Sequence, residues 1–111
     1  MSYSVIPIEK FKKEAKRLSK KYHSLKDELI VLNSLLSESP DSGTPLGNNT
    51  FKIRLAIKSK GKGKSGGARI ISYLLTENKD VFLLTIYDKA EMDSIDDKVL
   101  KQIIADLNSH V

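Results

Sequence analysis

The spacing of apolar residues changes at residue 51, and this change restricts the chain to a fold with both helices and strands. Up to residue 36, apolar side chains recur every three to four positions, as in a helix with one buried face. From residue 51 they alternate with polar residues, as in a half-buried strand. The predicted order is α-α-β-β-β-α. We expect an α+β fold with an N-terminal helical hairpin, an antiparallel sheet of three to four strands and a C-terminal helix.

The hairpin occupies the first third of the chain. Residues 1–6 form a short lead-in, and Pro7 suits the first turn of a helix that continues to Tyr22. Ser24 is the predicted cap of the second helix, which has a leucine stripe and is expected to be the more buried. The outer face of the first helix carries seven Lys or Arg residues. This face is either a solvated basic surface or a second contact surface for nucleic acid.

The second half of the chain contains the predicted strands, at residues 51–58, 68–75 and 81–87. Residues 37–49 and 59–67 are rich in Gly, Ser and Asn and are interpreted as loops. The last two strands form a hairpin around the turn at residues 77–80. Ser94 then caps a final helix whose apolar stripe runs from Leu100 to Leu107.

Size and composition exclude several classes of protein. A chain of 111 residues is expected to form a single domain, residues 1–111. The absence of Cys excludes disulfides and thiol catalysis. His23 and His110 are predicted surface residues, and no His, Asp or Glu cluster has metal-ligand spacing, so we expect no metal and no cofactor. The chain has no membrane-length apolar run and no signal-peptide pattern, which predicts a cytoplasmic protein without a membrane partner.

Positive charge is concentrated in residues 51–76, which contain seven Lys or Arg and no acid. The rest of the chain has a net charge of −2, so this segment accounts for the excess of basic over acidic residues. Such a segment attracts a polyanion, and nucleic acid is the leading candidate partner. Within it, residues 61–66 match G-x-G-x-x-G, but a strand follows instead of the helix that a dinucleotide site requires. The loop is either a soluble connection or a phosphate-binding loop, with Lys58, Lys60, Lys62 and Lys64 as RNA ligands.

Strand parity predicts which residues share the exposed face of the sheet. If the core receives Ile70, Leu74, Phe82, Leu84 and Ile86, the opposite face receives Lys52, Arg54, Arg69, Tyr73, Thr85 and Tyr87. Cations suit phosphate groups, and phenol rings can stack on bases. This assignment depends on the register, because a slip of one residue would reverse the faces.

The motif from Lys52 to Ile71, K-x-R-x-A-x-x-x-x-G-K-G-K-x-G-G-x-R-[IV]-I, resembles the RelE/ParE superfamily of bacterial toxins, especially its HigB/RelE-type branch. The motif L-L-x-I-Y-x-K, Leu83 to Lys89, resembles the same superfamily. The resemblance covers nearly the whole chain and implies a RelE-like toxin domain of a type II toxin–antitoxin system. It implies a ribosome-dependent endoribonuclease that cuts messenger RNA through the attack of the RNA 2′-hydroxyl on the adjacent phosphate.

The resemblance also implies roles for individual residues. Arg69 matches the arginine that holds the scissile phosphate, Lys52 and Arg54 match a basic pair on the preceding strand, and Lys89 matches a basic position after the last strand. RelE itself has a tyrosine farther on, within its closing segment, and Ile95 stands near that place here. Tyr87 is the candidate to replace it in catalysis, and Tyr73 is a candidate to stack on RNA.

The implied partners are a cognate antitoxin, the ribosome and messenger RNA, with operator DNA contacted only through the antitoxin complex. Two other functions stay open at the level of the sequence. One is a ParE-type inhibitor of DNA gyrase, which shares the fold. The other is a non-catalytic nucleic-acid-binding domain with the same basic loop.

Overall fold

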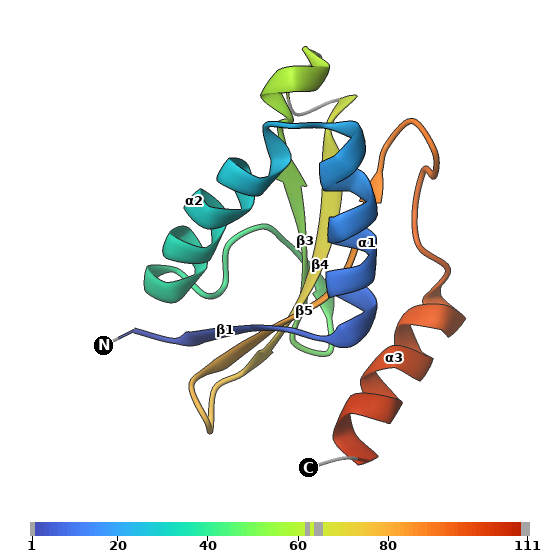
Figure 1. Ribbon diagram of the computed structural model, residues 1–111. Coiled ribbons are helices and arrows are strands. Elements are labelled where there is room, and N and C mark those ends of the chain that lie inside the picture. The colour runs from blue at the N-terminus through green and yellow to red at the C-terminus, as the bar shows by residue number, and fades with distance from the viewer. Residues whose placement is uncertain (1, 62, 64–65, 110–111) are drawn as a thin grey trace.

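The computed structural model describes residues 2–61, 63 and 66–109, and its elements confirm the predicted α+β class (Figure 1). A helical hairpin precedes the main strands, and a separate helix ends the chain. The elements are β1 (Ser4–Pro7), α1 (Glu9–Lys21), α2 (Leu25–Glu38), β2 (Thr44–Gly47), β3 (Thr50–Leu55), the 3-10 turn η1 (Lys58–Lys60), β4 (Ala68–Leu75), β5 (Asp80–Asp88) and α3 (Asp97–Ser109).

The sheet has five strands in the order β1-β5-β4-β3-β2, and β1 runs parallel to β5. β3, β4 and β5 correspond to the three strands predicted at residues 51–58, 68–75 and 81–87, and the sheet gains two edge strands that were not located. Each has four residues, too few to show a period, and each forms because a longer strand offers it hydrogen bonds. Pro7 ends β1 and does not begin a helix, and β2 lies within the stretch predicted to be a loop.

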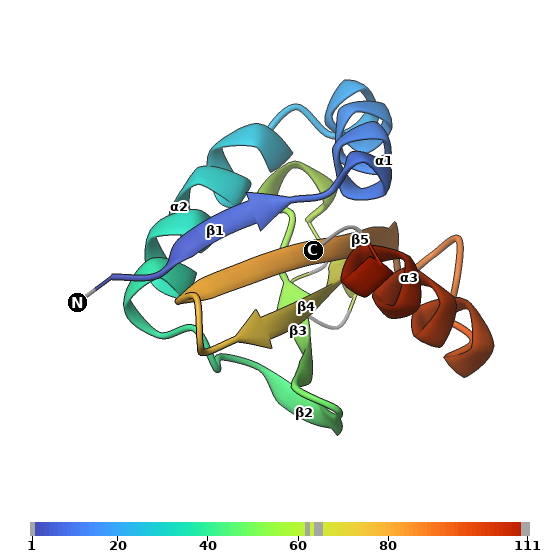
Figure 2. The same ribbon diagram turned by 90° about the horizontal axis from the view of Figure 1, so that it is seen from below.

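Helices cover both faces of the sheet (Figure 2). The hairpin packs on one face, where Leu18, Leu25 and Leu36 are fully buried. On the other face, α3 contributes one buried residue, Leu100, to a small cluster with Ile71 and Leu84. The lightly packed α3 face is where the basic strand residues lie.

A β-bulge in β5 explains why the predicted core faces are only partly correct. The pairing of β4 with β5 shifts between Ile71 and Ser72, which inserts an extra residue on β5 opposite that step. As a result Leu84 and Phe82 pack with the α3 cluster, away from Ile70 and Ile86. Thr85 is not on the predicted exposed face, because its hydroxyl donates to Glu14 of α1 at 2.7 Å.

The two predicted helix caps do not form as expected. Ser24 precedes α2, but its Oγ donates to Glu28 Oε1 at 3.1 Å and accepts no backbone N–H of α2. α3 begins later than predicted, at Asp97, and Asp96 accepts the Lys98 N–H at 2.8 Å. A short hydroxyl side chain does not specify its partner, so neighbouring Ser and Asp residues compete for a cap.

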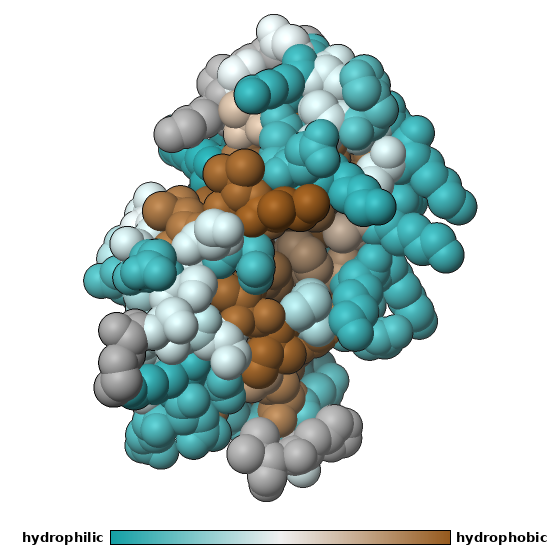
Figure 3. Space-filling model, turned by 60° about the vertical axis from the view of Figure 1, so that its left-hand side comes forward, coloured by the Kyte–Doolittle hydropathy of each residue, from teal (hydrophilic) through white to brown (hydrophobic). Residues whose placement is uncertain are grey.

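Part of the apolar surface of α2 faces outward. Ile30, Val31 and Leu35 are 60%, 70% and 48% exposed. Val31 and Leu35, with Leu55 and Ala56, border a groove of about 430 Å³ between α2 and β3. Figure 3 shows apolar side chains gathered on this side of the molecule. The apolar side of α2 is therefore only partly buried, although the second helix was expected to be the more buried one.

Replacing Gly67 with alanine is expected to destabilise the fold strongly. A Cβ atom at this position would lie 2.0 Å from the backbone oxygen of Leu55, where β3 and β4 meet. We expect a loss of about 3 kcal/mol or more in the free energy of unfolding, measured by urea denaturation. Gly61→Ala is the control: the space around it is open, and only its φ of 75° opposes a side chain. A similar loss for the two variants would contradict this explanation.

Candidate nucleic-acid interface

Three residues from neighbouring strands form a row on the α3 face of the sheet. Arg54 of β3 pairs with Arg69 of β4, and Arg69 pairs with Tyr87 of β5. Paired residues point to the same face, so their side chains are neighbours. Lys52 lies on this face too, two residues before Arg54. The predicted grouping of Lys52, Arg54, Arg69 and Tyr87, here called the sheet cluster, is therefore present in the structure.

The residues of the sheet cluster differ in their exposure to solvent. Arg54 is exposed and Lys52 is half-buried, whereas Arg69 is only 5% exposed. The Arg69 side chain donates from Nη1 to the Ala68 carbonyl at 3.1 Å, which helps to fix its direction. A guanidinium held in a partly desolvated place binds an anion more strongly than one on an open surface. The sheet cluster thus combines an accessible cation with a fixed one.

Tyr87 contributes a buried phenol. The residue is 4% exposed, and its Oη makes no hydrogen bond of good geometry with the described residues, although the backbone N–H of Ile95 lies close enough to lower the pKa of the phenol. Burial raises the pKa of Tyr87, and the positive charges of Arg69 and Lys89 offset only part of this effect. The phenol therefore carries its proton at neutral pH and is suited to donate a hydrogen bond.

A pocket of about 440 Å³ lies over Tyr87 and Lys52. Its floor is the sheet, one wall is α3, and another is the turn between β2 and β3. The residues that complete it were not predicted from the sequence; they include Thr50, Ser94, Leu100, Lys101 and Ile104. The only sign of them in the sequence is the position of Lys101 beside the apolar stripe of the last helix.

Tyr73 lies on the α3 face of the sheet but at a distance from the sheet cluster. It pairs with Thr50, at the opposite end of β3 from Arg54, and four residues along a strand span about 13 Å. Its ring packs against Phe82, with the centroids 6.4 Å apart, as part of the α3 cluster. The structure therefore separates this predicted RNA-stacking residue from Arg69.

The start of the glycine-rich loop is anchored to the helical hairpin. The backbone N–H of Lys58 donates to Glu28 Oε2 at 2.6 Å, and that of Ser59 donates to Ser24 Oγ at 2.9 Å. Lys58 itself is exposed and available to a ligand. Two further predicted RNA ligands, Lys62 and Lys64, lie outside the described residues.

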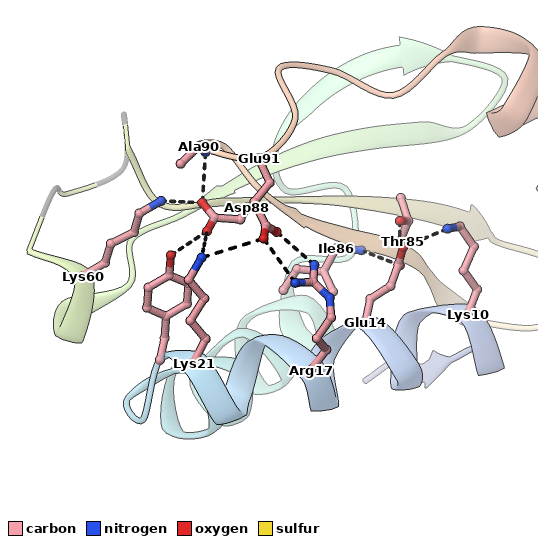
Figure 4. A network of polar contacts seen from close by, with 11 residues as sticks. Lys10, Glu14, Arg17, Lys21, Lys60, Thr85, Ile86, Asp88, Ala90 and Glu91 are labelled. Atoms are coloured by element: carbon pink, nitrogen blue, oxygen red, sulfur yellow. Dashed lines mark hydrogen bonds and ion pairs between the residues drawn. The ribbon is translucent and has the colours of Figure 1, made fainter.

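Lys60 is directed inward, which is not the position expected of a phosphate ligand. Its ammonium donates to Oδ1 of Asp88, a carboxylate that is fully buried at the end of β5 (Figure 4). Oδ2 of the same carboxylate accepts from the Tyr22 hydroxyl at 2.6 Å, and Oδ1 also accepts from the Ala90 N–H at 2.9 Å. Asp88 therefore joins η1, the end of α1 and β5.

This setting predicts a loss of stability in acid. Burial alone would raise the pKa of Asp88, but the bonds from Lys60, Tyr22 and the Ala90 N–H outweigh it and lower the pKa from 3.8 to about 2. A pKa lower in the folded state than in the unfolded state stabilises the protein above pH 4, and this contribution is lost as the pH falls toward 2. We expect a loss of about 2 kcal/mol from this group. Urea unfolding between pH 5 and pH 2 measures it, and Asp88→Asn should show a shallower pH dependence in that window.

The acids near the end of β5 have internal partners. Glu91 accepts from Arg17 of α1 at 2.9 Å, and Asp93 accepts from Lys89 at 2.8 Å (Figure 4 shows the first pair). The Lys89 ammonium lowers the pKa of Asp93. Lys89, a predicted catalytic residue, is thus held by an ion pair within the segment between β5 and α3. Across the described residues, no three His, Cys, Asp or Glu side chains form a group that could hold a metal ion.

Solved structures of other proteins share the fold described above. The helical hairpin, the antiparallel strands and the C-terminal helix together make the fold of the RelE-type toxins. One similar structure is a variant of the E. coli toxin RelE in the free state, with a TM-score of 0.61, 20% identity, and coverage of 84% of this chain and 90% of that one. Another is the toxin–antitoxin complex RelBE2 from Mycobacterium tuberculosis, with a TM-score of 0.57, 18% identity, and coverage of 79% and 99%. No family model matches the sequence.

The predicted RelE-like fold is therefore confirmed, and the assignment to the HigB-type branch stays a prediction. Among the described helices, none is long and apolar enough to cross a membrane.

Proposed function

We propose that this protein is the toxin of a type II toxin–antitoxin system and cuts messenger RNA on the ribosome. The observation that carries the proposal is the sheet cluster, in which Arg54, Arg69 and Tyr87 are cross-strand neighbours within a RelE-like fold. Two guanidinium groups beside one phenol provide charge and a proton at one place. The proposed partners are the ribosome, messenger RNA and a cognate antitoxin, the last supported by the similarity to a toxin from a toxin–antitoxin complex.

The proposed reaction uses the RNA as its own nucleophile. The 2′-hydroxyl oxygen forms a bond to the neighbouring phosphorus and loses its proton, the bond from phosphorus to the 5′-oxygen breaks, and that oxygen gains a proton. The products are a 2′,3′-cyclic phosphate and a free 5′-hydroxyl. Arg69 and Arg54 would stabilise the additional negative charge on the pentacovalent phosphate.

The proton transfers can be assigned within the sheet cluster by chemistry. Arginine does not release its proton in proteins, and burial keeps the proton on Tyr87. Lys52, acting as the free amine because an ammonium cannot accept a proton, is then the proposed acceptor for the 2′-hydroxyl proton. Tyr87 is the proposed donor to the leaving oxygen. Lys89 would add positive charge beside Tyr87. No step requires a metal or a cofactor.

The deciding experiment is primer extension on messenger RNA with purified protein, in the presence and absence of ribosomes. We expect new 5′ ends in the messenger only when ribosomes are present. Stalled gyrase–DNA complexes without RNA cuts would instead indicate a ParE-type inhibitor. RNA binding without cuts, and without an effect on growth after induction, would indicate a non-catalytic domain. A cytoplasmic location and contact with operator DNA only through the antitoxin complex are part of the same proposal.

A further inference from the structure

The outer face of α1 carries a row of lysines without counter-charges. The row lies on the side of the helix opposite to Phe11 and Leu18, which are buried in the core. Its members, here called the lysine row, are Lys12, Lys13, Lys16 and Lys20. All four are exposed, and none of their ammonium groups has an ion-pair partner among the described residues. The lysine row therefore presents positive charge to solvent.

The other three cations of α1 lie on a different side of the helix and are paired. Lys10 pairs with Glu14 at 2.8 Å, and Arg17 pairs with Glu91 at 2.9 Å. Lys21 lies 3.7 Å from the same Glu91. Figure 4 shows these three side chains directed toward β5. The acids beside α1 are thus engaged on this side of the helix, and the lysine row is left without them.

The lysine row works against the helix that carries it. Lys16 lies four residues from Lys12 and four from Lys20, a spacing at which like charges destabilise a helix. Lys12 also lies at the end of the first turn, where the helix dipole favours acids. Lysine and glutamate in alternation at this spacing would keep the helix soluble and stabilise it. A polyanion bound along the row would neutralise charges that the helix alone does not need.

The chemistry of the outer face distinguishes among anionic partners. None of the large apolar residues exposed in the described part of the chain belongs to α1, and the Tyr22 hydroxyl that follows the helix donates to Asp88. Single-stranded RNA binds through bases stacked on aromatic rings, and a protein partner needs an apolar centre. The lysine row offers neither. A double helix fits it, because phosphates line the outside and the bases are paired within.

We propose that the lysine row binds the phosphate backbone of a double-helical RNA segment, separate from the messenger that the sheet cluster would cut. From Lys12 to Lys20 the row extends about 12 Å along the helix axis, enough to contact several phosphates. α1 packs on one face of the sheet and the sheet cluster lies on the other, so the two surfaces hold different RNA segments. The inference rests on the proposed function for the choice of RNA over DNA.

The test measures binding of the whole protein to a fluorescent RNA hairpin with a stem of about 16 base pairs, between about 50 and 200 mM salt. Lys16→Gln removes one proposed phosphate contact. It should lower the slope of log affinity against log salt by about one, and Lys16→Gln with Lys20→Gln should lower it by about two. The double variant should also bind at least about tenfold more weakly at the lower salt concentrations. Its melting temperature should be unchanged or raised, because like-charge pairs are removed.

Lys98→Gln is the matched control. It removes the same charge from an exposed position on α3, across the sheet from the lysine row, and should bind the hairpin like wild type. Equal losses for Lys16→Gln and Lys98→Gln would show that only net charge matters and would overturn the proposal. So would binding through the row that is at least as tight with a single strand, a DNA duplex or an acidic peptide of similar charge.

Messenger cleavage on ribosomes, measured with the same variants, separates this inference from the proposed function. A protein that binds the RNA hairpin through the lysine row and cuts no messenger would keep the row and reject the nuclease. A protein that cuts messenger while all variants bind the hairpin alike would reject the row and keep the nuclease.

Discussion

Arg69→Ala is expected to lower the rate of messenger cleavage about 100- to 1,000-fold, the usual effect of removing one fixed group that stabilises transition-state charge. Arg69 lies in the middle of the row, paired with Arg54 on one side and Tyr87 on the other. Its burial strengthens its attraction for a phosphate. The measurement is the initial rate of appearance of cut messenger on programmed ribosomes.

Two controls separate this effect from unfolding. Arg17→Ala removes an exposed arginine whose described partner is Glu91, and it should cut at the normal rate. Arg69→Lys keeps the positive charge and loses the planar fork, so its rate should fall between those of wild type and Arg69→Ala. A folded Arg69→Ala protein that cuts like wild type would remove the sheet cluster from the mechanism.

Lys60→Met is expected to destabilise the protein by about 3 kcal/mol, because it removes the nearer and buried ion-pair partner of the Asp88 carboxylate and leaves only the exposed Lys21, 3.8 Å away. The Lys60 side chain is 8% exposed and Asp88 is fully buried, so water cannot replace the lost ammonium easily. Urea denaturation at neutral pH measures the change. The same substitution should affect cleavage only through the amount of folded protein.

Lys58→Met is the matched control, since it is in the same 3-10 turn with its side chain at the surface. Its effect on stability should be within about 0.5 kcal/mol. The double variant Lys60→Met with Asp88→Asn should recover part of the stability, because it removes the uncompensated charge. Equal losses for Lys58→Met and Lys60→Met would show that the pair with Asp88 is unimportant.

The sequence predicted the face on which the site lies because strand alternation is a local property. Lys52, Arg54 and Arg69 lie before the bulge, and their register needs only the simple period of two. Beyond Ile71 the bulge changes the pairing, and the predictions for Phe82, Leu84 and Thr85 were wrong. No residue type indicates such a bulge in the sequence. Assigning residues to the two faces of the sheet by alternation therefore fails beyond it.

The pocket and the Asp88 network could not be predicted because their parts are distant in the chain. Lys60 and Tyr22 meet Asp88 only after the hairpin has docked on the sheet. A lysine in a glycine-rich loop is typical of a phosphate ligand, and the inward direction of Lys60 depends on an acid 28 residues away. Lys101 likewise becomes part of the pocket lining only because α3 packs on β4 and β5.

The parallel pairing of β1 with β5 has a consequence for how the protein is made. The residues of β1 are synthesised before the other strands but pair with residues 80–83, so β1 cannot be paired until β5 has been made. β5 also supports α1 and lies between β1 and β4. Long-range contacts of this kind slow folding. A nascent chain that stops before residue 80 would therefore have neither a complete core nor Tyr87, and incomplete translation products should be inactive.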